Sequence, residues 1–190
     1  MTEMYFDINP KIIDAIYEEF NAEKTVNKLV RKTSGLMGAE LEGTLKNFFT
    51  EYGQSLMMRA LDLGEKYQDT TYKVIKAHAE KVGPFPNVPQ RFIEICYLSI
   101  LQIEKLTITE SNLKRLGYKI ERCSIYNTIR EKMGEKISNQ MFCKHACSTL
   151  AKTLYENMKI ETDFHIKALM AKDNYCYFIS EKKTNQKNKF

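Results

Sequence analysis

The chain has 190 residues, of which 43% are hydrophobic and 28% are charged. This composition lies close to the average for globular proteins and excludes a disordered, collagen-like or purely coiled-coil chain. The sequence has neither an apolar stretch long enough to span a membrane nor the basic and apolar regions of a secretory signal. We therefore expect a cytoplasmic protein without a membrane partner.

The net charge of +5 is concentrated at the C-terminus. The last ten residues, 181–190, contain four lysines and one glutamate, and so carry +3 of this charge. We expect residues 182–190 to form a disordered basic tail. Because the remaining sequence has no basic stripe and no nucleic-acid-binding fingerprint, we expect no nucleic-acid partner.

The first half of the chain has the periodicity of helices. Asn9 followed by Pro10 is a typical helix start, and a further short helix is expected over residues 25–32. Apolar residues at steps of three and four predict a long helix over residues 39–63. Asp69 is the expected N-cap of another helix that ends at Gly83.

Three of the four prolines lie within residues 84–89, where we expect a connection to a half of mixed structure. Residues 91–104 are apolar on both the helical and the alternating pattern, which leaves their secondary structure open but indicates burial. In the segments that follow, alternating apolar and polar residues predict strands over 106–110, 118–123, 164–168 and 175–179. Helical spacing of the apolar residues predicts helices over 125–132 and 139–158.

These patterns predict an α+β fold, in which an N-terminal helical layer packs with a C-terminal antiparallel sheet that carries one long helix. We expect the helical half, residues 1–83, and the mixed β-α-β half, residues 90–181, to form one compact domain together. The segment 172–174, Lys-Asp-Asn, is the expected turn between the last two strands.

Four of the five cysteines lie in the second half, and we expect all five to be free thiols. Cys143 and Cys147 share a face at the start of a predicted helix, Cys123 ends a strand, and Cys176 lies in the last strand. A β-α-β arrangement would bring these four side chains to one pocket at a helix N-terminus. The positive end of the helix dipole stabilises a thiolate there, which acts as a nucleophile or a metal ligand.

Two other interpretations of the same cysteines stay open. Unpaired cysteine often serves as a small apolar core residue, and Cys96, inside an apolar run, is expected to do so. Cys123, Cys143, Cys147 and Cys176 are also candidate ligands for zinc or an iron–sulfur cluster. The spacing lacks the Cys-x2-Cys pair of standard zinc sites, so a protein without a cofactor is the simpler expectation.

Several motifs carry a resemblance to a known family. They are Arg122-Cys123 at a strand end, the segment 142–147 that opens a helix, the segment 172–178 and the helical segment 45–55. In these segments the chain resembles the L-2-amino-thiazoline-4-carboxylic acid hydrolase family. Its second half also looks like the vinyl-reductase type of small-molecule-binding domain.

The resemblance implies a hydrolase that opens a C–N bond of a small cyclic amidine, such as a 2-aminothiazoline carboxylate. Cys143 or Cys147 would attack the electrophilic ring carbon or orient water, and Asp173 would carry a proton. Cys123, Cys176 and Tyr175 would contact the substrate. The alternative is a non-enzymatic binding or sensing domain that uses the same cysteines for a small ligand or a metal. Whether the chain forms a homo-oligomer is left open.

Overall fold

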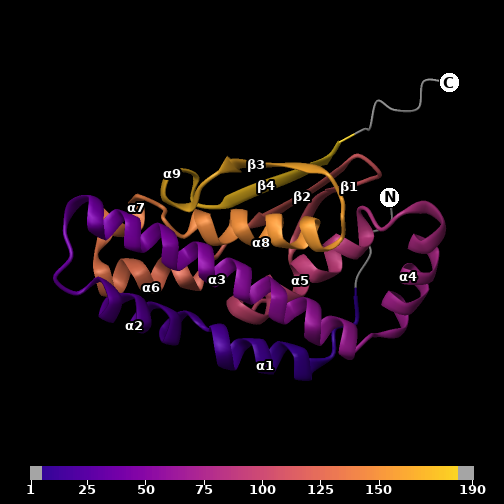
Figure 1. Cartoon of the computed structure of the whole chain (residues 1–190), viewed down its shortest axis with the longest axis horizontal. Helices are drawn as coiled ribbons and strands as arrows, with labels where there is room; N and C mark the ends of the chain where they lie inside the picture. The colour runs from indigo at the N-terminus through magenta and orange to yellow at the C-terminus, as the bar shows by residue number, and fades with distance from the viewer. Residues whose placement is uncertain (1–5, 184–190) are drawn as a thin grey trace.

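The computed structural model describes residues 6–183 and confirms the α+β class. The first elements are helices, as Figure 1 shows: α1 (Pro10–Phe20), α2 (Ala22–Thr33), α3 (Gly38–Lys66), α4 (Thr70–Val82) and α5 (Asn87–Leu101). The remainder is mixed: β1 (Thr107–Ser111), β2 (Arg115–Ile120), α6 (Ser124–Met133), α7 (Glu135–Asn139), α8 (Lys144–Asn157), β3 (Thr162–Ala168), α9 (Met170–Asp173) and β4 (Cys176–Lys182). The greater part of the expected tail, residues 184–190, lies outside the described residues.

Side-chain caps fix several helix starts where the sequence predicts them. The side chain of Asn9 accepts a hydrogen bond from the backbone N–H of Lys11 at the start of α1. Asp69 does the same for Tyr72 in α4, at 2.7 Å. The segment of open secondary structure, residues 91–104, is largely helix α5, which is buried on almost every side. A helix that is buried on almost every side has no solvent-exposed polar face, so its periodicity does not distinguish it from a buried strand.

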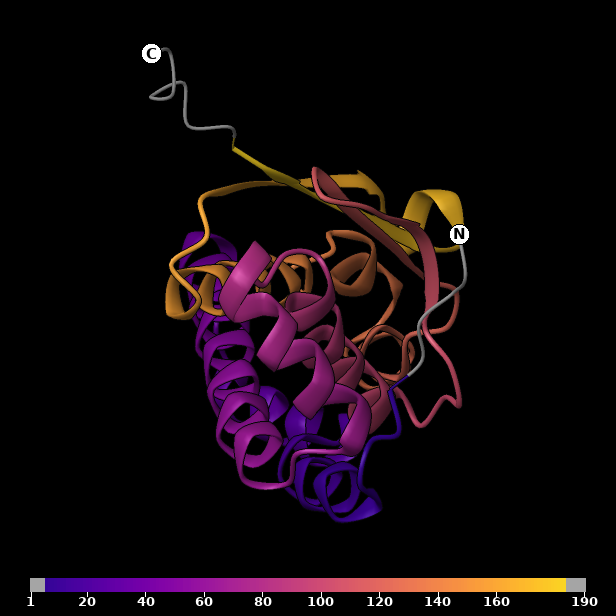
Figure 2. The same ribbon diagram turned by 90° about the vertical axis from the view of Figure 1, so that its right-hand side faces the viewer.

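The four strands of the described chain form an antiparallel sheet in the order β1-β2-β4-β3. One face of the sheet covers the helices, and α8 lies directly beneath it (Figure 2). Tyr118 of β2 pairs with Phe178 of β4, and both side chains are fully buried on this inner face. On the outer face, the ammonium group of Lys119 lies over the rings of Tyr175 and Tyr177.

The long helix α3 packs along α8, and a glycine permits the close approach (Figure 1). A Cβ atom at Gly53 would lie 2.8 Å from Cα of Ala146 and still closer to its carbonyl oxygen. The helix predicted over residues 139–158 begins later than expected, at Lys144. Met141 adopts a left-handed conformation with φ of 54°, which interrupts the helical path after α7 ends at Asn139.

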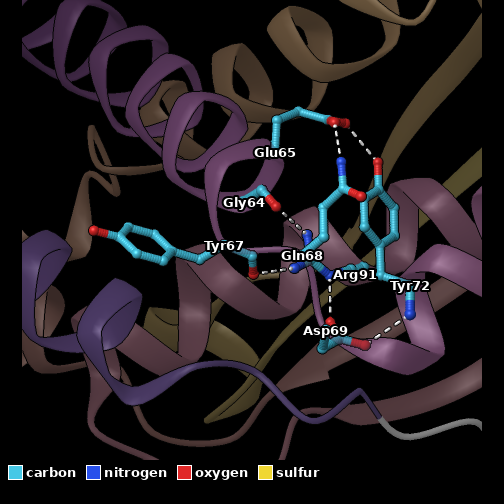
Figure 3. Close-up of polar contacts among 7 residues, drawn as sticks. All are labelled: Gly64, Glu65, Tyr67, Gln68, Asp69, Tyr72 and Arg91. Carbon is cyan, nitrogen blue, oxygen red and sulfur yellow. Dashed lines mark hydrogen bonds and ion pairs between the residues drawn. The ribbon is translucent and has the colours of Figure 1, made fainter.

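A fully buried arginine fastens α5 to the end of α3 and the start of α4 (Figure 3). The Nε atom of Arg91 donates to Asp69 at 2.9 Å, and its two Nη atoms donate to the carbonyls of Gly64 and Tyr67. The guanidinium carbon lies 4.0 Å from the ring centroid of Tyr72. Because these partners satisfy the guanidinium inside the fold, this cluster is a structural feature and not a ligand site.

Within residues 6–183, no helix is both long and apolar enough to cross a membrane. The second half carries the long helix α8 between strands, as expected. The expected turn at residues 172–174 is instead the end of the short helix α9, after which Asn174 takes a left-handed conformation. This arrangement places α8, α9 and the inner face of the sheet around a common space.

Candidate functional site: a cysteine-lined cavity

A cavity lies between the start of α8, the inner face of the sheet and the helices α5 and α6. The centre of a water-sized molecule can move within about 40 Å³ of it. This volume has room for roughly three water molecules, or for one small molecule about as large as the three together. Cys123, Cys143, Cys147 and Cys176 all line this cavity, so the topology does bring these four side chains together.

Each of the four cysteines is held by a different local feature. Cys123 is the N-cap of α6, where its sulfur accepts from the backbone N–H of Tyr126 at 3.4 Å. Cys143 is the N-cap of α8, and Cys147 lies one turn further along that helix. Cys176 opens β4 opposite Ile120 of β2. The cysteines therefore sit at element ends that converge on one space.

Burial controls the electrostatics of these thiols. It raises the pKa of Cys143 and of Cys147 well above the ordinary value, and neighbouring cysteines raise both further. Burial also raises the pKa of Cys123, and it raises that of Cys176 to about 12. A helix N-terminus lowers a thiol pKa only where the surroundings do not desolvate the thiolate, and at these four positions burial is the largest influence on the pKa and raises it. All four thiols are neutral near pH 7.

The two other residues expected to act on a substrate do not line the cavity. The Asp173 carboxylate accepts from the backbone N–H of Leu169 at 2.8 Å and so closes the α9 turn. Tyr175 lies under the ammonium group of Lys119, with 5.0 Å between the nitrogen and the ring centroid. The local role of Asp173 is that of a cap, and the Tyr175 ring packs on the outer side of the sheet.

The described residues do not contain a cluster of three or more His, Cys, Asp or Glu side chains that could hold a metal ion. The four cysteines thus share a cavity without forming a coordination shell in this structure. None of the three histidines lines the cavity either, and His165 lies 3.6 Å from Glu181 at the partly exposed end of the sheet. All five cysteines are free thiols, and Cys96 is fully buried in the core, as expected.

Tyrosines on the cavity wall are the feature that sequence reasoning missed. Tyr52, Tyr97 and Tyr126 line the cavity from α3, α5 and α6. Two of the hydroxyls are bonded: Tyr52 donates to the Phe20 carbonyl at 2.7 Å, and Tyr126 pairs with Asn139 at 3.1 Å. Tyr97 lies inside a continuous apolar run, so no periodic signal distinguishes it from an ordinary core residue.

Comparison with known proteins gives distant structural matches alone. No family model and no curated protein matches the chain. Among solved structures, the unliganded Fe(II) form of a variant H-NOX protein from K. algicida is 14% identical, with a TM-score of 0.42, over 93% of this chain and 95% of that one. An H-NOX protein from S. oneidensis in the Fe(II)NO state is 14% identical, with a TM-score of 0.38, over 91% and 98% of the two chains.

These findings correct the family and the function expected from the sequence motifs. The resemblance to the L-2-amino-thiazoline-4-carboxylic acid hydrolase family and to vinyl-reductase-type domains is wrong, because no family model and no curated protein of either kind matches the chain. The expected hydrolase is wrong as well, and the site agrees: its thiols are protonated and its expected proton carrier is a turn cap. At such low identity and TM-score, we transfer neither iron chemistry nor function from the H-NOX proteins to this chain.

Proposed function

We propose that the chain is a non-catalytic binding domain that takes a small, neutral, mainly apolar molecule into the cysteine-lined cavity. The observation that carries this proposal is the cavity itself, whose accessible wall consists of apolar atoms from converging elements. The four protonated thiols contribute polarizable surface without charge. Such a wall favours an uncharged guest, because a buried ion without a partner is strongly disfavoured.

The size of the cavity restricts the guest further. With about 40 Å³ open to the centre of a water-sized molecule, the site holds a molecule of a few non-hydrogen atoms. Lys144 is the one charged residue among those that line it. Apolar cavities of this kind, too poor in polar partners to hold water firmly, bind apolar gases and small hydrocarbons.

Two methionines make the proposal directly testable. Met141 and Met170 line the cavity, whereas Met37 is 78% exposed and does not. The experiment titrates the full chain, labelled with ¹³C at methionine methyls, with isobutene and follows the methyl resonances by NMR. We expect saturable shifts of Met141 and Met170 and an unmoved Met37. Unmoved cavity methyls, or equal and non-saturating shifts of all three, would contradict the proposal.

A cavity-filling variant is the matched test of location. Cys143→Leu places a larger side chain in the cavity and should abolish the isobutene shifts. Cys176→Leu fills the same space from the sheet side and serves if the first variant does not fold. Cys96→Ala changes a buried thiol outside the cavity and should leave the titration unchanged. Retained binding in a folded Leu variant would place the guest elsewhere.

A further inference from the structure

Several buried hydroxyl groups of the described residues have no hydrogen bond, and one of them belongs to a residue on the cavity wall. The hydroxyls of Tyr97, Tyr118, Tyr155 and Ser180 are buried and have no hydrogen-bond partner among the residues that the structure describes. Tyr97 is 3% exposed and lines the cavity, and its ring centroid lies 5.6 Å from that of Tyr118. The other two tyrosines of the cavity wall, Tyr52 and Tyr126, have bonded hydroxyls.

Folded proteins leave few buried polar groups unbonded, and each one calls for a partner. Burial raises the pKa of the Tyr97 hydroxyl, and the nearby Cys147 thiol and Tyr118 hydroxyl raise it further, although neither contact has the geometry of a hydrogen bond. The hydroxyl therefore lies close to Cys147, which also lines the cavity. A water molecule needs two to four polar partners, which the apolar wall does not supply. A ligand that has one hydrogen-bond acceptor and is otherwise apolar would fit both the unbonded Tyr97 hydroxyl and the apolar cavity wall.

We propose that Tyr97 is the specificity-determining residue of the cavity and donates a hydrogen bond to a carbonyl-type oxygen of the bound molecule. The ligand class is then a small neutral ketone or aldehyde, oriented with its oxygen toward Tyr97 and its alkyl part toward the thiols. Because the Tyr97 hydroxyl is buried, the proposed hydrogen bond requires the side chains around it to move as the oxygen enters. This inference rests on the proposed binding function and adds the chemistry of the ligand.

Acetone and isobutene separate the two claims, because the two molecules have the same shape and differ by an oxygen in place of a CH₂ group. Their affinities are measured from the Met141 and Met170 methyl shifts in the full chain. Tyr97→Phe should weaken acetone binding by about three- to tenfold, the effect of one neutral hydrogen bond. The same change should leave the affinity for isobutene within about twofold.

Tyr155→Phe is the matched control, since it removes an unbonded buried hydroxyl from a residue that does not line the cavity. It should change neither affinity. Cys147→Ala shortens a cavity side chain close to the Tyr97 hydroxyl and should strengthen acetone binding relative to isobutene, which gives a second test that keeps the tyrosine intact.

The outcomes distinguish this inference from the proposed function. If isobutene binds the unaltered chain but Tyr97→Phe leaves acetone affinity unchanged, the proposed hydrogen bond from Tyr97 is wrong, whereas the proposed binding in the cavity is still supported. If both probes lose affinity equally in Tyr97→Phe, the residue shapes the cavity without selecting the oxygen, which also overturns the inference. If isobutene fails to bind the unaltered chain, the proposed function itself fails.

Discussion

Gly43 and Gly53 both lie in helix α3, but substitution by alanine is expected to have opposite effects on stability at the two positions. Alanine is favoured over glycine in a helix interior by about 1 kcal/mol, and this term is the same at both positions. At Gly43, apart from its chain neighbours and its own helix backbone, an added Cβ meets no atom of residues 6–183 within 4 Å, so Gly43→Ala should stabilise the protein by about that amount. At Gly53 the Cβ would overlap the backbone of Ala146 in α8.

The overlap at Gly53 involves backbone atoms, which cannot rotate away, so α3 and α8 must move apart. Overpacking of this kind costs roughly 1–3 kcal/mol, and a backbone contact belongs at the upper end. Because the helix-propensity terms cancel, the two variants should differ in unfolding free energy by about 3 kcal/mol. Urea denaturation followed by circular dichroism measures this difference. Equal stabilisation by both substitutions would refute the close α3–α8 contact that positions Cys143 and Cys147.

Three further predictions concern buried charge and the thiols. Arg91→Met leaves the buried Asp69 carboxylate without its partner and should cost about 3–5 kcal/mol in urea unfolding; Arg59→Met, at a partly exposed ion pair, should cost at most about 1 kcal/mol. Burial raises the pKa of Glu94 to about 7, whereas in the unfolded chain this carboxyl loses its proton near pH 4.5, so the free energy of unfolding should fall as the pH rises from about 4.5 to 7. Unfolding curves of Glu94→Gln should lack this decline, and an identical decline in the variant would rule out Glu94 as its source. Iodoacetamide at pH 8 should modify the cavity thiols far more slowly in the native than in the unfolded protein, because burial raises their pKa; mass spectrometry that shows Cys143 modified at the rate of a free thiol would contradict this.

The sequence indicates the secondary structure best where a local signal is strong. Asn9, Asp69 and Gly83 mark helix ends through capping chemistry, which acts over a few residues, and the structure has these ends. The sequence predicts the start of α8 too early, because the left-handed conformation of Met141 has no sequence signature comparable to glycine. The pattern of residues 91–104 does not identify helix α5, because tertiary burial removes the polar face that reveals a helical period.

The candidate site shows a similar division. Helical spacing and strand position are enough to predict that Cys123, Cys143, Cys147 and Cys176 share one cavity. They are not enough for its chemistry, because the pKa of a thiol depends on how far the surrounding elements exclude water. That balance between the helix dipole and desolvation is a property of the packed structure, as is the unbonded hydroxyl of Tyr97.

Xenon binding in a crystal of this protein tests the central claim most directly, because xenon enters an accessible apolar cavity whatever the natural ligand is. Diffraction from crystals held under xenon pressure should show a xenon atom among the sulfurs of Cys123, Cys143, Cys147 and Cys176. The same experiment on Cys143→Leu should show that position empty. Absence of xenon from the cysteine-lined cavity of the unaltered chain, or an ordered polar solvent network filling it, would contradict the account.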